Sequence, residues 1–158
     1  MRTEQSVEQF QHHAGLVLDS AEAECVVGEA AAFARALPDP TARERYERLA
    51  ESSASGVVPD ELVGPLETML ELVFSTGRPS NRAVLQAVFA KTPRGRQQSA
   101  DAREVNRALQ VLHGQTIADL RLASAGPSRQ TFVIETERCK VNMEFDRQGA
   151  RIVSLEAG

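Results

Sequence analysis

Two residues near the junction of the helical and strand-like parts of the sequence could do acid–base chemistry. Asp119 lies between the apolar residues Ile117 and Leu120. A carboxyl group in an apolar pocket has a raised pKa and can act as a general base, so Asp119 is a ligand-pocket candidate. His113 is a second candidate, because the end of a helix dipole favours its charged form. The structural alternatives are that Asp119 faces water opposite Arg121 and that His113 only caps its helix.

A basic segment could bind phosphate groups. Its five cations lie within 17 residues and are the candidate contacts for a nucleic acid: Lys91, Arg94, Arg96, Arg103 and Arg107. Within it, Pro93-Arg94-Gly95-Arg96 resembles the core of an AT-hook, with Gln97 in place of the second flanking proline. That resemblance implies contact with the minor groove of A·T-rich DNA. The alternative is a solvated loop between two helices.

The histidine pair and the cysteines give no complete site. His12 and His13 are adjacent, with Glu8 four residues before the first, but a zinc site needs three or four ligands. We interpret the pair as exposed surface residues and predict neither a metal nor a cofactor. Cys25 and Cys139 fall on apolar positions, where a thiol usually behaves as a small hydrophobic side chain.

Known catalytic motifs are absent from the sequence. It contains no GxxxxGK[ST] or GxGxxG phosphate loop, no GxSxG elbow and no CxxC pair. Aromatic residues make up 4% and there is no tryptophan, which argues against platforms that stack nucleic-acid bases. We therefore expect no catalytic residues to be recognisable from motifs alone.

Composition is that of a globular protein. The 158 residues are 42% hydrophobic and 25% charged, with a net charge of −4. The charge is uneven, because residues 1–79 carry 6 Arg and 14 acidic groups whereas residues 80–158 carry 12 basic and 8 acidic groups. The 16 Arg against 2 Lys are typical of a GC-rich bacterial genome. With no apolar signal or membrane segment, we expect a cytoplasmic protein with both thiols reduced.

Five helices are predicted before residue 114. Capping boxes at Ser6 and at Thr41 predict two of the helix starts. The apolar residues of the third helix cover more than half of its surface, so we expect it to be the most buried. The predicted helices cover residues 6–37, with Asp19-Ser20 as a candidate break near the middle, then 41–54 and 60–75, a short helix capped by Ser80, and residues 99–113, with a polar loop over 91–98.

The first predicted helix carries a stripe of small residues. These interface candidates recur at steps of three, four and seven: Ala14, Ala21, Cys25, Gly28 and Ala32. Small side chains let a neighbouring helix approach closely, and two-fold oligomers are common. We therefore predict a homodimer that uses this stripe.

The hydrophobic period changes to two after residue 116. Strands are predicted over 117–123, 131–136, 139–145 and 151–155. In the third, Cys139, Val141, Met143 and Phe145 alternate with polar residues, as expected for a sheet covered on one side. Short connections predict an antiparallel meander.

Helices followed by strands indicate an α+β fold, five helices packed on a four-stranded antiparallel meander. A four-stranded sheet with one apolar face needs cover, so we predict one domain over residues 1–158. The alternative is that residues 1–56 form a loosely attached helical extension to residues 57–158.

Three functions remain open. The favoured hypothesis is a non-catalytic interaction protein, an adaptor, chaperone or regulatory subunit, that binds a protein partner through helical surfaces. The second is a small-ligand protein or enzyme, because the order of helices and meander resembles the nuclear-transport-factor-2-like cone. That resemblance implies a pocket between helices and sheet, holding Asp119 or His113. The third is weak nucleic-acid binding through the basic segment.

Overall fold

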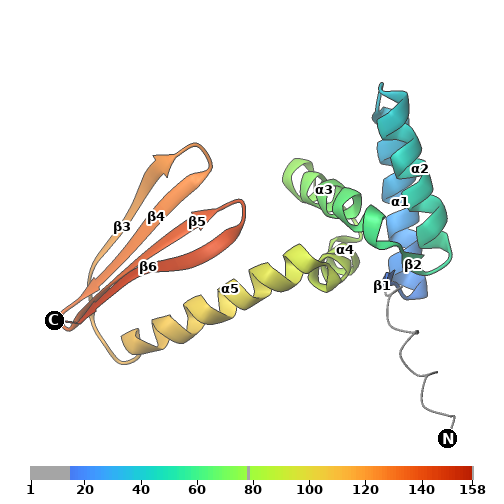
Figure 1. Ribbon diagram of the computed structural model, residues 1–158. Helices are drawn as coiled ribbons and strands as arrows, with labels where there is room; N and C mark the ends of the chain where they lie inside the picture. Colours follow the sequence, from blue (N-terminus) through green and yellow to red (C-terminus); the bar gives the residue numbers. More distant parts are fainter. Residues whose placement is uncertain (1–14, 78, 158) are drawn as a thin grey trace, which may run out of the picture. The chain divides into compact units, whose positions relative to one another are not determined.

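The chain has the α+β architecture predicted from its sequence, with five helices followed by a four-stranded antiparallel sheet (Figure 1). The computed structural model describes residues 15–77 and 79–157. Contacts divide the chain into two compact units, one ending at Arg94 and the other beginning at Gly95. We describe each unit by itself. The sequence predicts that residues 1–158 unfold together as one domain. This stays a prediction.

Helix α1 begins later than predicted. It covers Ser20–Ala36, and Asp19 and Glu22 form its capping box: each carboxylate accepts the backbone N–H of the other residue. The short strand β1 (Leu16–Val17) precedes it and pairs with β2 (Val57–Val58). The prediction of helix over the described part of 6–37 is therefore wrong before residue 20, and the candidate break at Asp19-Ser20 is where the helix begins, because Asp19 caps it. The predicted cap at Ser6 lies outside the described residues.

Helices α2 and α3 lie within one residue of their predicted bounds, whereas α5 begins six residues earlier than predicted and Asn81, not Ser80, is at the N-cap position of α4. Helix α2 starts one residue early, because Asp39 accepts the N–H of Ala42 and Pro40 occupies the first helical position. The predicted Thr41 capping box is thus wrong by two residues. The helices after α1 are α2 (Pro40–Ala54), α3 (Asp60–Thr76), α4 (Arg82–Lys91) and α5 (Pro93–Leu109), and a 3₁₀ turn, η1 (Gln110–Leu112), ends the helical part.

The helical unit has its own core. Helix α3 contributes five buried side chains, more than any other described helix, as predicted. Helices α1 and α2 form a hairpin, in which the rings of Phe33 and Tyr46 meet edge to face at 4.6 Å. The fully buried apolar side chains of this unit are Val26, Ala30, Leu49, Val58, Leu66, Met69, Leu70, Leu85 and Val88.

The polar loop predicted over residues 91–98 is wrong. Only Thr92 separates α4 from α5, and Pro93 begins the new helix. Proline suits this position because it has no backbone N–H, and the N–H at the start of a helix would have no partner within the helix. The next N–H, that of Arg94, donates to the Glu67 carboxylate of α3 at 2.9 Å. The helix start is thus stabilised by a residue 27 positions away, which a local sequence pattern does not reveal.

The second unit is a sheet with one helix against it. Its strands are β3 (Ile117–Gly126), β4 (Arg129–Thr136), β5 (Cys139–Asp146) and β6 (Gly149–Ala157), paired in chain order. The predicted meander is therefore confirmed. Gly114, at φ 74°, ends the helical part as expected. The tight β4–β5 turn is held by Thr136, whose hydroxyl accepts the N–H of Cys139 at 2.9 Å.

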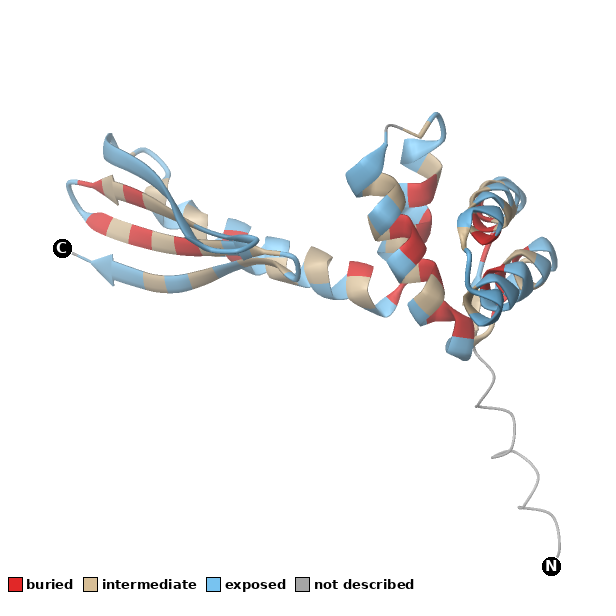
Figure 2. Ribbon diagram, turned by 90° about the horizontal axis from the view of Figure 1, so that it is seen from above, coloured by how far each residue is buried: buried red, intermediate tan, exposed pale blue. Residues whose placement is uncertain are grey.

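Helix α5 covers the middle of the sheet and leaves the edge strand β3 exposed along its whole length. Val105 packs with Ile134, Cys139, Val141 and Met143 to form the second core. Figure 2 shows the buried residues of the sheet gathered in the two central strands. A helix is about 10 Å wide and strands lie about 4.8 Å apart, so one helix covers about two strands. Near the end of β5, Phe145 is 39% exposed although its alternation predicts an inward position.

Candidate functional site

The two predicted pocket residues do not lie in a pocket. The Asp119 carboxylate is half exposed and lies 2.8 Å from the guanidinium of Arg121, on the outer face of the sheet. His113 is exposed just after η1. Neither residue lines either of the two clefts described below. A cone-like fold would hold its ligand between the helices and the sheet. In this chain, the side chains of the second core fill the space between α5 and the sheet.

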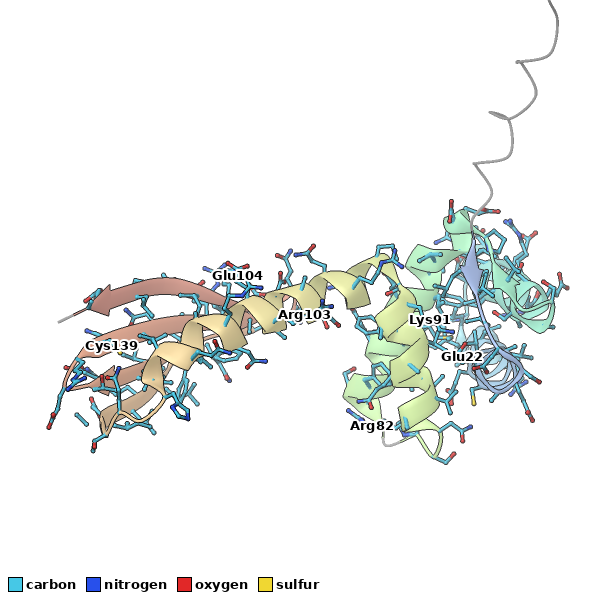
Figure 3. The ribbon with its side chains drawn as sticks, turned by 90° about the horizontal axis from the view of Figure 1, so that it is seen from below. Glu22, Arg82, Lys91, Arg103, Glu104 and Cys139 are labelled. Carbon is cyan, nitrogen blue, oxygen red and sulfur yellow. The ribbon has the colours of Figure 1, made fainter. Side chains whose placement is uncertain are left out.

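The predicted basic set is divided between the two units. Lys91 lies in the first unit, where its ammonium group is 2.5 Å from the Glu22 carboxylate (Figure 3). Arg94 belongs to the same unit and pairs with Glu71 at 2.8 Å. Both residues hold α4 and the start of α5 to neighbouring helices. These contacts give Lys91 and Arg94 structural roles that their sequence neighbourhood does not indicate.

The other three cations form a stripe on α5. Arg96, Arg103 and Arg107 are spaced by seven and four residues, which places them on one face of the helix. That face is exposed and lies opposite the one that carries Val105. Residues 93–96 are helical and Gly95 is buried, so the AT-hook-like segment is not the free chain that would lie in a minor groove. Figure 3 labels Arg103 and its neighbour Glu104.

The predicted interface stripe lies outside the core of α1. Ala21, Gly28 and Ala32 are exposed and Cys25 is half-buried, whereas the buried side of α1 is formed by residues one or two positions later: Glu22, Val26, Ala30 and Ala34. A side chain added at Gly28 would meet nothing within 4 Å. Ala14 lies outside the described residues. The role of this stripe in a dimer stays a prediction.

No metal site is found among the residues that the structure describes. His12 and His13 lie outside that range. Burial and, secondarily, the charge of Glu24 raise the pKa of the Cys25 thiol, which keeps it protonated. Cys139 is buried in the sheet core. No helix within 15–77 and 79–157 is long and apolar enough to cross a membrane.

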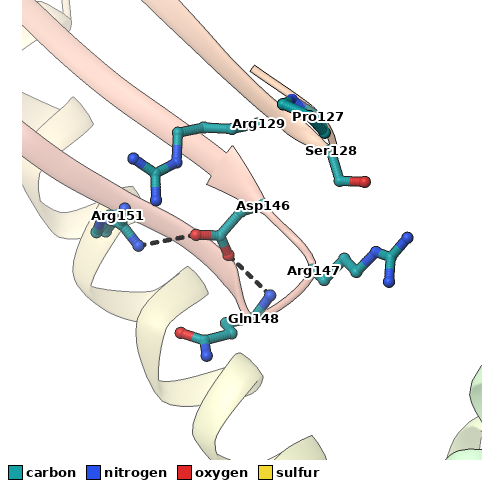
Figure 4. A pocket seen from close by; sticks show the side chains of 7 residues that line it. All are labelled: Pro127, Ser128, Arg129, Asp146, Arg147, Gln148 and Arg151. Atoms are coloured by element: carbon teal, nitrogen blue, oxygen red, sulfur yellow. Dashed lines mark hydrogen bonds and ion pairs between the residues drawn. The ribbon is translucent and has the colours of Figure 1, made fainter. Parts of the chain in front are cut away.

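A cleft that the sequence analysis missed lies at one end of the sheet (Figure 4). Its volume is about 490 Å³, and it is lined by the β3–β4 and β5–β6 turns: Pro127, Ser128, Arg129, Asp146, Arg147, Gln148 and Arg151. The first and third turns of a meander always lie at the same end of the sheet. The predicted turns could therefore have brought these three arginines together.

Asp146 limits what this cleft can bind. The backbone N–H of Gln148 donates to its carboxylate at 2.7 Å and holds the pKa of Asp146 below its usual value, with Arg151 as a further cause. Hydrogen bonds to Glu144 and Asp146 raise the pKa of Arg151. The carboxylate of Asp146 therefore stays charged inside the cleft and opposes an incoming anion.

The second cleft is in the helical unit, between the start of α1 and the end of α2. Its volume is about 470 Å³. Leu18, Ala23 and Val27 give it an apolar wall, and Asp19 and Glu24 lie at its side. Ser20 and Ser55 also line it, but the Asp19 carboxylate accepts the N–H of Glu22 and the Ser55 hydroxyl donates to the Ser52 carbonyl, so these two groups are held in local backbone contacts.

The most exposed element of the sheet is β3. It is an edge strand, and all ten of its residues are exposed. Six of them, from Asp119 to Ser124, pair with β4 in an unbroken register, because the irregularities lie before Asp119 and after Ser124. The backbone groups on the outer side of this stretch face no other strand of the sheet. Such an edge can accept a further strand.

Large apolar side chains accompany this edge. Leu120 and Leu122 are 51% and 66% exposed. They pair with Ile134 and Phe132, so they extend from the sheet face that α5 covers. Asp119 and Arg121 lie on the opposite face, where Arg121 also contacts Glu135 at 3.0 Å. The β3 edge therefore combines free backbone, an apolar side and a charged side.

The candidate functional site is this edge, which we call the β3 edge and define as residues 117–124. Asp119, predicted from the sequence as a possible base, is the one predicted candidate residue within it. The signal for an edge was present in the predicted strand order, because the first strand of a meander has only one neighbour. No protein-family model, curated protein or solved structure matches the chain, so the assignment rests on the geometry described above.

Proposed function

We propose that the chain is a non-catalytic interaction protein that binds a polypeptide along the β3 edge. The observation that carries this proposal is the pair Leu120 and Leu122, two large apolar side chains exposed beside free strand backbone. Proteins usually protect edge strands with proline, inward-pointing charges or short length. Strand β3 has ten residues, no proline and apolar residues on its inner side.

A strand added to this edge would use two kinds of contact. Its backbone would bond to the outer N–H and C=O groups of β3, and its side chains would cover Leu120 and Leu122. Covering these side chains gains about 25 cal/mol for each Å² of apolar surface removed from water. The sequence predicts the binding surface on the helices. The exposed large apolar residues favour the sheet, because Leu72 is the only one in helices α1–α5.

A photo-crosslinking experiment tests the proposal. We expect p-benzoylphenylalanine in place of Leu122 to crosslink to a polypeptide when the protein is illuminated in the cell that makes it. The matched control has the same probe at Val153, a similarly exposed apolar residue on the other edge strand, β6. Adducts of a defined mass at position 122 but not at 153 would support the proposal. Equal labelling at both positions, or none at 122, would contradict it.

The arginine stripe of α5 favours a second candidate function, contact with the phosphates of a nucleic acid. Three guanidinium groups along one exposed helix face can each displace a counterion from the phosphate backbone. We expect Arg103→Ala with Arg107→Ala to weaken duplex binding and to lower the slope of log K against log salt by about two. The double change Arg45→Ala with Arg138→Ala is the control, since it removes the same charge elsewhere. Equal effects of the two double variants would reject the stripe as a binding site.

A further inference from the structure

We infer that the occupant of the β3 edge is the β3 edge of a second copy of this chain, paired antiparallel about Leu120. The inference rests on the proposed function, because it names the partner for the same surface. Its basis is the charge pattern Asp119-Leu120-Arg121, which is complementary to itself when the strand is reversed. The product would be a two-fold symmetric dimer with a continuous eight-stranded sheet.

Antiparallel pairing restricts the registers that β3 can adopt with its own copy. Residues that face each other across two antiparallel strands place their side chains on the same face of the sheet. A residue on the α5 side must therefore face another residue on that side. The register must therefore be centred on one residue, which faces the same residue of the second copy across the two-fold axis. Registers centred between two consecutive residues are excluded.

Only one of these registers pairs opposite charges. With Leu120 at the centre, Asp119 of each copy faces Arg121 of the other. Centring on Asp119 would place two aspartates opposite each other, and centring on Arg121 would place two arginines opposite each other. Centring on Leu122 would leave both charged residues facing alanine. Directly opposed like charges are destabilising, so the charges select the register at Leu120.

The same register covers the apolar margin. The two Leu120 side chains would face each other, and Leu122 of each copy would lie diagonally next to Leu120 of the other, within reach across the pair. Both leucines extend from the face that α5 covers, so α5 of the two copies would lie on the same side of the joined sheet. The exposed Arg121 would then lie between its own Glu135 and Asp119 of the second copy.

Charge reversal tests the register. The chain has a mass of 17.2 kDa, and we expect analytical ultracentrifugation of the wild type to give about twice that mass. Asp119→Arg and Arg121→Asp should each weaken self-association about tenfold or more, because each creates two facing like-charged pairs. Mixing the two variants should restore the dimer, and so should the double variant that carries both changes. Restoration also shows that the single variants are folded.

Two controls separate this surface from others. Glu156→Arg changes charge on the exposed part of β6, the other edge strand, and should leave the dimer intact. Gly28→Leu places a bulky side chain on the α1 stripe, where the single chain has room for it, and should also leave the dimer intact. A dimer that Gly28→Leu disrupts and the β3 variants do not would overturn the inference in favour of the α1 stripe.

The remaining outcomes distinguish this inference from the proposed function. A monomeric wild type whose position 122 crosslinks to a different polypeptide would overturn self-pairing and leave the proposed function standing. A monomeric wild type with no adduct at position 122 would overturn both. Failure of the two charge variants to associate when mixed, despite native circular dichroism spectra, would overturn the register at Leu120.

Discussion

Replacing Leu66 with alanine is expected to lower the free energy of unfolding of the helical unit by about 2–5 kcal/mol. Leu66 is fully buried in the core that α3 forms with α1, α2 and α4. Truncating such a side chain loses its transfer free energy and leaves a cavity. Because the two cores share no residue, we expect the loss of amide protection in hydrogen exchange to be confined to residues up to Arg94.

The reciprocal change is Val141→Ala in the core of the sheet, where Val141 is also fully buried. It should weaken amide protection in β4 and β5 and leave α1–α4 unaffected. Together the two variants test the domain organisation predicted from the sequence. Equal loss of protection in both units after either change would show one cooperative domain over 1–158 and contradict the expectation of separate unfolding.

Replacing Lys91 with methionine is expected to lower the free energy of unfolding of the helical unit by about 2 kcal/mol. The Glu22 side chain is only 4% exposed, and Lys91 lies 2.5 Å from its carboxylate. Removing the Lys91 cation leaves the Glu22 carboxylate buried. Among the described residues, its remaining hydrogen-bond donor is the N–H of Asp19 in the capping box. Because the Lys91 side chain is itself 42% exposed, we expect the loss of stability to lie in the lower part of the range for hydrogen bonds between charged groups.

A double-mutant cycle separates the charge from the packing. Adding Glu22→Gln to Lys91→Met removes the uncompensated charge and should recover at least half of the lost stability. Arg48→Met is the control, because it breaks an exposed pair with Glu61 whose atoms are 3.7 Å apart. Exposed pairs contribute about 0–1 kcal/mol. If Lys91→Met were as mild as Arg48→Met in thermal or urea unfolding, the Glu22–Lys91 pair would not be a determinant of the fold.

The sheet was the most predictable part of the molecule. Alternation with period two is visible in the sequence, as in the residues from Cys139 to Phe145. The turns between strands contain glycine or have only two residues, and such turns join neighbouring antiparallel strands. Both signals depend on residues close together in the chain. For this reason the strand order and most strand positions could be predicted before the structure was known.

The starts of α1 and α2 were missed because of local caps, but other errors arose where distant residues decide the structure. The start of α5 at Pro93 depends on Glu67 of α3, and the role of Lys91 depends on Glu22 of α1. The buried position of Glu22 contradicts its polarity and is explained only by its two hydrogen-bonding partners, the N–H of Asp19 and the ammonium of Lys91. A sequence pattern records the polarity of a residue but not the partner that compensates for its burial.

The sequence by itself determined the α+β order, most of the helical and strand segments and the meander, because these follow from local periodicity, caps and turns. It also contains the self-complementary charges around Leu120. Only the tertiary structure decided that α5 covers β4 and β5 and leaves Leu120 and Leu122 exposed on β3. The reason is geometric: one helix is about as wide as two strands, and its placement over the sheet depends on side-chain packing between segments far apart in the chain.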